Sequence, residues 1–365
     1  MSGRFGHIAS GKKLRFVVPA VLFGIFTYLT WTYCHKLCYD EIYINRQEHG
    51  TAVGLMFTEI FLTLALFTAW LQLVLVKAGR QPKLLPYYIL RDDYARIEED
   101  PSSLNSSRLD MIFPPKVYPC DPQGYPIWCS ECQSVKDHRT HHSSMLGYCV
   151  PRFDHYCVWV GSIIGRKNYK LFVQYMFFGT MWAILVVTSI ACYLDDILLR
   201  RHHIPRINPN ILICFGLSCI GLLMIFPLFV SHCYYMATNR TSIEVLQTKR
   251  RASWRKLWFC YYRAQDNCRY VLEFSPKETQ RCYRKSSIFQ NIKEFMGSNV
   301  LTWIIPIGTN IKCTEPELNE YKEILGPYLE TVSDQFEKMI EERIQAGQYV
   351  KTLHVYGDKL KEISE

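Results

Sequence analysis

The N-terminal region of this sequence lacks the small-residue cleavage site that ends a secretory signal peptide, although basic residues precede its first apolar run. The chain also lacks internal repeats and long low-complexity tracts, so neither a repeat array nor a low-complexity protein is expected. Its 15 cysteines lack the arrangement of a small disulfide-stapled secreted domain, because several fall inside apolar runs. Fold class must therefore be inferred from how apolar and charged residues segregate along the chain.

Charged residues are scarce in four long runs, although 21% of all residues are charged. The runs cover about 14–34, 51–76, 171–194 and 211–236, and each is close to or above the roughly 20 residues that span a bilayer. Soluble core helices are a poor alternative, because each run is long and nearly uncharged. The sequence therefore predicts an α-helical polytopic membrane protein with four transmembrane helices.

Basic residues cluster before the first run and after the fourth, whereas the short loop at 35–50 carries balanced charge. Positive residues stay on the cytosolic side, so both termini should be cytosolic. The loop at 195–210 fits less well, because it holds three arginines. The predicted order is a cytosolic N-terminus (1–13), two transmembrane helices (14–76), a cytosolic loop (77–170), two further transmembrane helices (171–236) and a cytosolic C-terminal region (237–365). Nothing in this pattern selects among the ER, Golgi, vacuole and plasma membrane.

The net charge of +9 is concentrated beside the predicted spans. That placement fits the anionic lipids of a cytosolic leaflet and an anionic substrate such as CoA. Nucleic acid, the usual alternative partner of a basic protein, is disfavoured by the same placement. The lipid bilayer is therefore the first partner that the sequence predicts.

A cysteine-rich stretch lies in the predicted cytosolic loop, where metal binding or catalysis is more common than a disulfide. Cys129 and Cys132 form a Cys-x-x-Cys knuckle, and His142 and Cys149 follow at spacings that can close a tetrahedral shell. Three thiolates and one imidazole predict a structural Zn²⁺ ion. Unmetallated thiols are the alternative, and His141 is an adjacent candidate ligand that spacing does not exclude.

The tetrapeptide Asp154-His155-Tyr156-Cys157 supplies the parts of a nucleophilic site. His155 can deprotonate the thiol, Asp154 can orient the imidazole, and the Cys157 thiolate can attack a carbonyl. Adjacent residues need not point together, however. On the residues alone, His155 and Cys157 as further zinc ligands remain an equal alternative.

These residues belong to an ordered set of motifs that resembles the DHHC protein S-acyltransferases, or palmitoyltransferases. The motifs fill the cysteine-rich segment at about 127–172 and continue after the fourth run: Lys136, Arg139, His141 and His142; Val150, Arg152, Asp154 and His155; Asn168 and Phe172; Thr241 to Glu244; Asn291 to Gly297. The four predicted spans fit the same family. The chain is most similar to the small fungal members that carry a DHYC tetrapeptide.

The resemblance implies transfer of a long-chain acyl group, typically palmitoyl, from acyl-CoA to membrane-proximal cysteines of protein substrates through an acyl-Cys157 intermediate. It assigns catalysis to three residues and structural ties between regions to three others: Cys157, His155 and Asp154; Thr241, Glu244 and Asn291. Four cations become candidates for contacts with CoA phosphates, with solvated surface charge as the alternative: Arg139, Arg152, Arg166 and Lys167. The active site should face the cytosol.

Members of this family typically hold two zinc ions, and this chain departs from that pattern. Carried over by position, the second site would use four residues that are not metal ligands here: Ser143, Leu146, Tyr156 and Ile163. Their joint replacement predicts one Zn²⁺ per chain, with apolar packing in place of the second ion. On this interpretation, Tyr156 replaces a metal ligand, and the catalytic residues Asp154, His155 and Cys157 are all retained.

Two other functions are considered. A catalytically silent membrane scaffold is suggested by the altered tetrapeptide and opposed by the retained Asp154, His155 and Cys157. A transporter would need polar pairs at midspan or broken helices, and the four runs offer little of either.

Weaker patterns lie outside these motifs. Apolar residues at helical spacing predict an amphipathic helix at 333–346, either docked or open to a partner. Thr314 and Glu317 resemble a capping box, and 99–107 resembles a linker.

Two residues within the spans invite a functional hypothesis. Trp182 can close an acyl-chain cavity, or it can be an ordinary packed aromatic. Glu59 lies near a predicted span end, where snorkelling or a helix contact is expected.

Overall fold

The computed structural model describes residues 3–87, 114–199, 208–250, 256–306, 325 and 329–354. The chain forms two units. The first comprises Met1–Lys77, Tyr156–Tyr234 and Asn299–Asn310, and the second comprises Ala78–His155, Tyr235–Ser298 and Ile311–Glu365. The predicted linker at 99–107 and the predicted cap at Thr314 and Glu317 lie outside the described residues.

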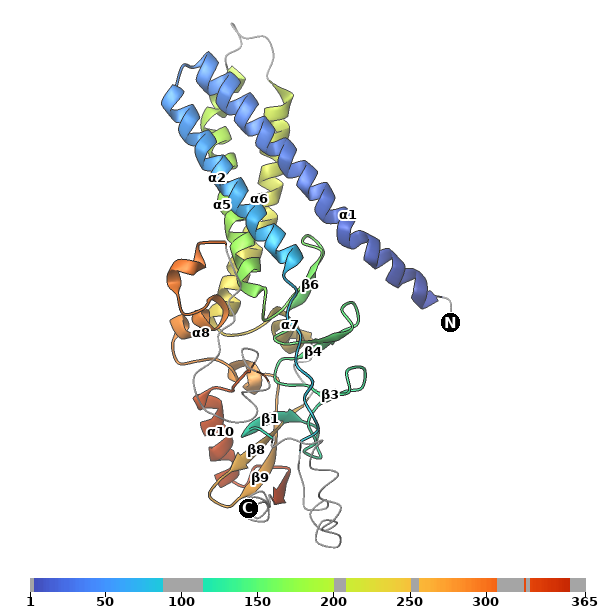
Figure 1. The fold of residues 1–365 in the computed structure, drawn as a ribbon. Helices are drawn as coiled ribbons and strands as arrows, with labels where there is room; N and C mark the ends of the chain where they lie inside the picture. The colour runs from blue at the N-terminus through green and yellow to red at the C-terminus, as the bar shows by residue number, and fades with distance from the viewer. Residues whose placement is uncertain are drawn as a thin grey trace. The chain divides into compact units, whose positions relative to one another are not determined.

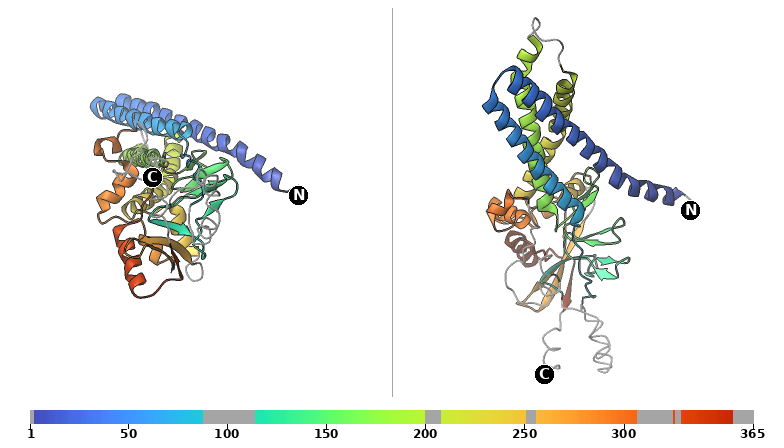
Figure 2. Two further views of the ribbon diagram at one scale, coloured as in Figure 1. Left: turned by 60° about the horizontal axis from the view of Figure 1, so that its bottom comes forward. Right: turned by 45° about the horizontal axis from the view of Figure 1, so that its top comes forward.

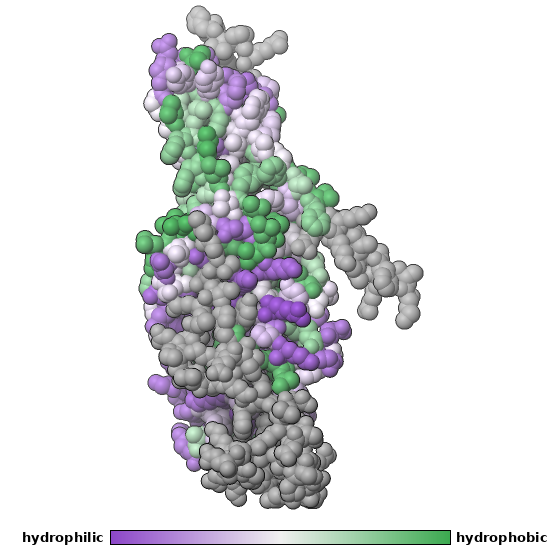
Figure 3. Space-filling model, viewed as in Figure 1, coloured by the Kyte–Doolittle hydropathy of each residue, from purple (hydrophilic) through white to green (hydrophobic). Residues whose placement is uncertain are grey.

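The first unit, called here the membrane unit, is built from long apolar helices. Figure 1 shows α1 (Gly3–Trp31), α2 (His49–Leu75), α5 (Tyr169–Leu199) and α6 (Pro209–Ala237). The segments long and apolar enough to cross a membrane are Phe16–Asn45, His49–Leu75, Tyr169–Leu194 and Pro209–Ala237, and apolar side chains gather over these helices in Figure 3. Within the described residues, these segments agree with the four predicted spans in number and approximate position.

The predicted loop at 35–50 is wrong. The first helix continues as the π-helix η1 (Thr32–Asn45), and only residues 46–48 connect it to α2. Tyr33, Leu37 and Ile42 are buried at spacings close to one helical turn, so this segment packs into the bundle. The balanced charge at 35–50 therefore belongs mostly to the end of an amphipathic helix and not to a loop.

A short segment from the C-terminal region returns to the membrane unit. The 3-10 helix η5 (Val300–Trp303) lies in this segment. The Gln174 side-chain amide donates hydrogen bonds to the carbonyls of Thr302, Trp303 and Ile305 at 3.1, 2.9 and 2.8 Å. The side-chain amide of Gln72 on α2 also donates to the Pro306 carbonyl. Side-chain amides of both α2 and α5 therefore bind the backbone of this segment.

The second unit, called here the aqueous unit, contains an antiparallel sheet that the sequence analysis did not predict. Its strands are β1 (Val117–Cys120), β8 (Leu257–Arg263), β9 (Cys268–Phe274) and β10 (Lys351–His354), in the order β1-β8-β9-β10. Seven of the 14 residues in β8 and β9 are aromatic or β-branched, which suits strands. Their hairpin turns at Asn267, whose φ of 53° is tolerated by asparagine.

The predicted amphipathic helix is confirmed as α10 (Asp334–Gln345), and it docks on this sheet (Figure 2). The Ser333 hydroxyl accepts a hydrogen bond from the Phe336 backbone N–H and caps the helix. Phe336 packs on Phe259 and Phe274 of the sheet, with ring centroids 5.2 and 5.0 Å apart. The apolar face of α10 is thus covered by its own chain. The unit also contains α7 (Ser242–Arg250), η4 (Glu278–Arg281) and α8 (Ile288–Met296).

Candidate active site

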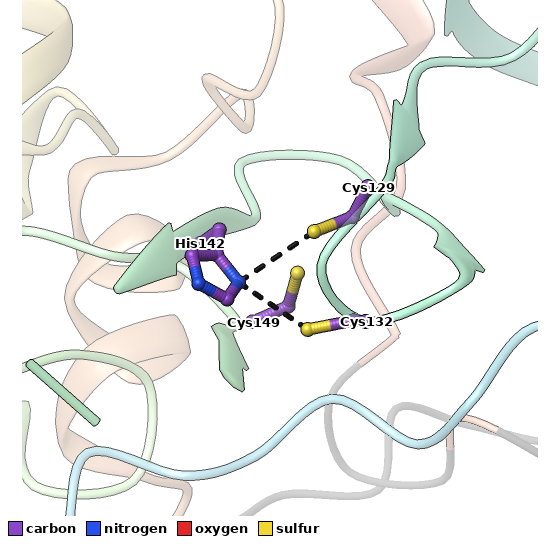
Figure 4. Close-up of side chains that lie close together, drawn as sticks. All are labelled: Cys129, Cys132, His142 and Cys149. Carbon is purple, nitrogen blue, oxygen red and sulfur yellow. Dashed lines mark hydrogen bonds between the residues drawn. The ribbon is translucent and has the colours of Figure 1, made fainter. Parts of the chain in front are cut away.

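Two β-hairpins of the aqueous unit bring the predicted zinc ligands together (Figure 4). The first hairpin pairs β2 (Trp128–Cys129) with β3 (Ser134–Val135), and the second pairs β4 (His141–Ser143) with β5 (Tyr148–Val150). The ligand atoms of the set Cys129, Cys132, His142 and Cys149 all lie within 4.8 Å of one another. His142 Nδ1 lies 3.5 Å from the Cys129 sulfur and 3.3 Å from the Cys132 sulfur.

This donor set fits Zn²⁺, which prefers three thiolates and one imidazole in a closed structural site. Burial opposes ionisation of the Cys129 thiol, but hydrogen bonds, chiefly from the Cys132 backbone, lower its pKa. Burial raises the pKa of the Cys149 thiol, and a bound metal cation would favour its thiolate form. His141 stays outside the ligand set, and its ring packs edge-on against Phe153 at 6.0 Å. Spacing alone did not distinguish the two histidines.

Asp154 is buried and holds the neighbouring imidazole. One of its oxygens, Oδ2, lies 2.6 Å from Nδ1 of His155. The Ser242 backbone N–H donates to Oδ1 at 2.7 Å, and the Ser242 hydroxyl donates to Oδ2 at 2.9 Å. The first residue of α7 therefore fixes the carboxylate that orients the imidazole. No sequence pattern singled out Ser242, although it lies inside the motif from Thr241 to Glu244.

The nucleophile follows on the short strand β6 (His155–Cys157), which pairs with β7 (Ser162–Ile164). The chain passes from the aqueous unit to the membrane unit inside β6, between His155 and Tyr156. Residues i and i+2 of a strand project to the same face, so the strand directs His155 and Cys157 to one side. Cys157 is buried, with 6% of its surface exposed.

The positions that would hold a second metal are used for other purposes. The Ser143 hydroxyl accepts a hydrogen bond from the Leu146 backbone N–H at 3.2 Å and so caps the turn between β4 and β5. Ile163 is buried beside Ile164, which is fully enclosed. The Asn168 side chain accepts from Gly165 N and donates to Ile163 O, both at 2.9 Å, which fixes β7 against the start of α5.

The downstream motif residues make local ties in the aqueous unit. Thr241 and Glu244 form a reciprocal cap at the start of α7, because Thr241 N donates to Glu244 Oε2 at 2.9 Å and Glu244 N donates to Thr241 Oγ1 at 3.4 Å. Asn291 on α8 donates to the Ala237 carbonyl at 3.0 Å. These contacts connect the end of α6 with α7 and α8.

Two of the four cations predicted to meet CoA are engaged elsewhere. The buried Arg139 guanidinium donates to both carboxylate oxygens of Glu244 at 2.7 and 3.0 Å. The buried Arg152 guanidinium donates to both oxygens of Glu330 at 2.5 and 2.6 Å. CoA contacts by these two arginines therefore remain a prediction that this geometry disfavours. No sequence motif pointed to Glu330.

The membrane unit contains a narrow apolar cavity between α1 and α2. Its lining is mostly aromatic: Phe23, Phe26, Phe67, Trp70, Trp159 and Tyr175. Trp182 packs on Phe26 with ring centroids 5.0 Å apart, and its indole N–H donates to Glu59 at 3.0 Å. Glu59 is fully buried, so it makes a helix contact and does not snorkel.

Comparisons with known proteins agree with the motifs. The family model of the DHHC palmitoyltransferase matches residues 123–249. Palmitoyltransferase PFA5 of Saccharomyces cerevisiae is 42% identical over 353 residues, which are 94% of this chain and 94% of that protein. Palmitoyltransferase PFA5 of Kluyveromyces lactis is 39% identical over 350 residues, or 96% and 98% of the two chains. Palmitoyltransferase ZDHHC15 of Rattus norvegicus is 24% identical over 296 residues, or 80% and 78%.

The similarity to the yeast proteins extends along nearly the whole of both chains, so it includes the four spans as well as the cysteine-rich segment. The motif residues, the zinc-ligand geometry and these relatives all lead to the same conclusion. The chain belongs to the DHHC palmitoyltransferase family of protein S-acyltransferases.

Proposed function

We propose that Cys157 carries the acyl group in a two-step transfer from a long-chain acyl-CoA, such as palmitoyl-CoA, to a cysteine of a membrane-bound protein. The Cys157 thiolate attacks the thioester carbonyl, the bond from that carbon to the CoA sulfur breaks, and CoA leaves. The thiolate of the substrate protein then attacks the acyl-Cys157 carbonyl and releases the Cys157 thiolate. Each step exchanges one thioester for another, so catalysis needs mainly ionisation and positioning.

The hydrogen bond of 2.6 Å between Asp154 and His155 is the observation that carries this proposal. It makes Nδ1 the donor toward the carboxylate, so Nε2 is the nitrogen that receives the Cys157 proton. Asp154 stabilises the imidazolium that forms, and CoA takes the proton as it leaves. The carboxylate is buried and also accepts two hydrogen bonds from Ser242, which suits it to this orienting role.

The aromatic cavity of the membrane unit is the proposed site of the acyl chain. Trp159 lines it and lies two residues after Cys157, so a chain on the sulfur can enter between α1 and α2. Trp182 packs on the lining residue Phe26 and is the candidate to close the cavity. An apolar lining excludes water from the chain and favours long acyl groups.

The remaining partners follow from the same topology. Lys167, which is partly exposed, and Arg166, which is buried, lie just before α5 and are the cations we propose for the CoA phosphates. An interfacial Cys157 facing the cytosol would select substrate cysteines close to the membrane. One zinc ion held by the four-ligand site would supply rigidity to the hairpins and take no part in the transfer.

The test uses the full chain, purified in detergent or bilayer discs and incubated with radiolabelled palmitoyl-CoA. The wild type should take up label that hydroxylamine releases, and Cys157→Ser should take up none. Tyr156→Phe is the matched control, because it removes only a hydroxyl next to the nucleophile and should keep the label. A folded, zinc-loaded wild type that stays unlabelled would support the silent scaffold and overturn the proposal.

A further inference from the structure

Glu330 lies outside every recognised motif, yet it is enclosed in the aqueous unit. It precedes α10 by four residues and is 5% exposed. A buried carboxylate is costly unless it is paired, so its partners indicate why the fold retains it. Those partners are Arg152 and Arg139.

Arg152 is the closer partner and lies two residues before Asp154. Its Nε and one terminal nitrogen bind the two oxygens of Glu330 side by side, in the bidentate geometry that gives the strongest arginine–carboxylate pairs. The other terminal nitrogen donates to the Glu294 carbonyl at 3.2 Å, and the guanidinium lies 4.6 Å above the Phe295 ring. Glu330 is therefore the main counter-charge of this buried arginine.

Arg139 extends the network to α7. It lies 3.6 Å from Glu330 and binds Glu244 at 2.7 Å, so two arginines and two glutamates alternate in one chain of charges, of which Glu244 alone is partly exposed. Glu244 caps α7, the helix whose first residue, Ser242, holds Asp154. Both supports of Asp154, its own turn and the start of α7, are thus connected to Glu330.

The backbone shows why this connection matters. Arg139 and Arg152 have φ values of 59° and 43°, in the left-handed region that residues other than glycine rarely adopt. Such conformations persist only where the surroundings enforce them. The two turns are also linked to each other, because Phe153 N donates to the Arg139 carbonyl at 3.2 Å. At Arg152 the side chain contacts Glu330, Glu294 and Phe295, and the two bonds to Glu330 are the shortest of these contacts.

We infer that Glu330 is a positioning residue, which holds Arg152 in its left-handed turn and thereby sets the Asp154–His155 pair for reaction. This inference rests on the proposed function, because it concerns the rate at which Cys157 is loaded. Loss of the Glu330 charge leaves Arg152 without its main counter-charge and lets the turn relax. A displacement of about 1 Å at a reacting group is enough to slow a reaction by roughly two orders of magnitude.

The test measures the burst of CoA release from palmitoyl-CoA with the full chain in bilayer discs. Burst amplitude counts folded active sites, whereas the rate constant reports how well each site is positioned. Glu330→Gln should lower the rate constant per site by about tenfold or more, with the KM for palmitoyl-CoA changed less than about twofold. The matched control is Glu337→Gln on α10, which breaks a partly exposed pair with Lys116 and should leave both quantities unchanged.

A second variant covers the case in which Glu330→Gln does not fold. The pair Arg152→Gln with Glu330→Gln leaves no uncompensated buried charge, so thermal stability should recover while the slow rate constant persists. A normal rate constant with reduced amplitude, in either variant, would make Glu330 merely structural and overturn the inference. A wild type without any burst would instead refute the proposed function, so the two failures are distinguishable.

Discussion

Two consecutive lobes of the cysteine-rich segment differ in what holds them together. In the lobe of β2 to β5, here the metal lobe, four ligand atoms lie within 4.8 Å of one another around a zinc-binding arrangement. In the lobe of β6 and β7, here the catalytic lobe, Val160, Ile163 and Ile164 are buried and Asn168 bonds to the strand backbone. The metal ligands of the first lobe are spaced along hairpins too short to build a core of their own.

The difference leads us to expect that the catalytic lobe does not need a metal ion of its own to hold its side chains in place. Asp154, His155 and Cys157 depend on hydrogen bonds from α7 and on apolar burial, neither of which uses a metal. The two lobes should therefore respond differently to metal removal, to loss of a hydrogen bond and to loss of apolar volume.

Metal removal should give the largest effect. Cys132→Ser or chelation should release one zinc ion per chain and unfold the metal lobe, because structural zinc sites contribute about 10–16 kcal/mol to folding of small domains. Metal analysis and thermal unfolding check this outcome. Cys192→Ser, which alters an exposed thiol away from the site, should keep the metal. Two zinc ions per wild-type chain would contradict the prediction that only the metal lobe binds zinc.

Asp154→Asn should have the second-largest effect, and it should slow catalysis without loss of the metal. The amide removes the charge that stabilises the imidazolium, so acyl loading of Cys157 should slow by roughly 10²- to 10⁴-fold. Zinc content should remain that of the wild type, because Asp154 is not one of the four proposed zinc ligands Cys129, Cys132, His142 and Cys149. Single-turnover loading with palmitoyl-CoA measures the rate, and an unchanged rate would remove Asp154 from the proposed mechanism.

Ile164→Ala tests the apolar character of the catalytic lobe. The side chain is fully buried, and truncating such a residue costs about 2–5 kcal/mol. Thermal unfolding in detergent should show a lower midpoint with the zinc still bound. Val158→Ala, two residues before the enclosed Val160, is a milder change in the same lobe because Val158 is only partly buried. Equal losses in both variants would argue against tight apolar packing at β7.

Tyr156→Phe should give the smallest effect on both activity and stability. Within the described parts of the chain, its buried hydroxyl has no hydrogen-bond partner, so removal should be neutral or slightly stabilising, by less than about 1 kcal/mol. Thermal unfolding and palmitate labelling measure the two effects. A large loss of labelling would show that the Tyr156 hydroxyl takes part in the transfer. The catalytic lobe would then contain a catalytic group in addition to Asp154, His155 and Cys157.

Much of the fold was predictable where it depends on local patterns. Run length and missing charge located the four spans, and Phe336, Ile340 and Ile344 located α10. The prediction failed at η1, because a balanced set of charges on a helix end resembles a loop in sequence. It also missed the four-stranded sheet, since β1 pairs with β8 across more than a hundred residues and has no periodic signal of its own.

By itself, the sequence determined the parts on which the proposed chemistry depends: a thiol two residues from an imidazole, a four-ligand set that fits zinc, and four apolar spans. Each of these depends on residue type and short spacing, which the chain carries directly. Only the tertiary structure decided which cations are available, because Arg139 and Arg152 look like surface charges until Glu244 and Glu330 pair with them 105 and 178 residues away. Burial and ion pairing depend on long-range contacts, and these exist only after the chain has folded.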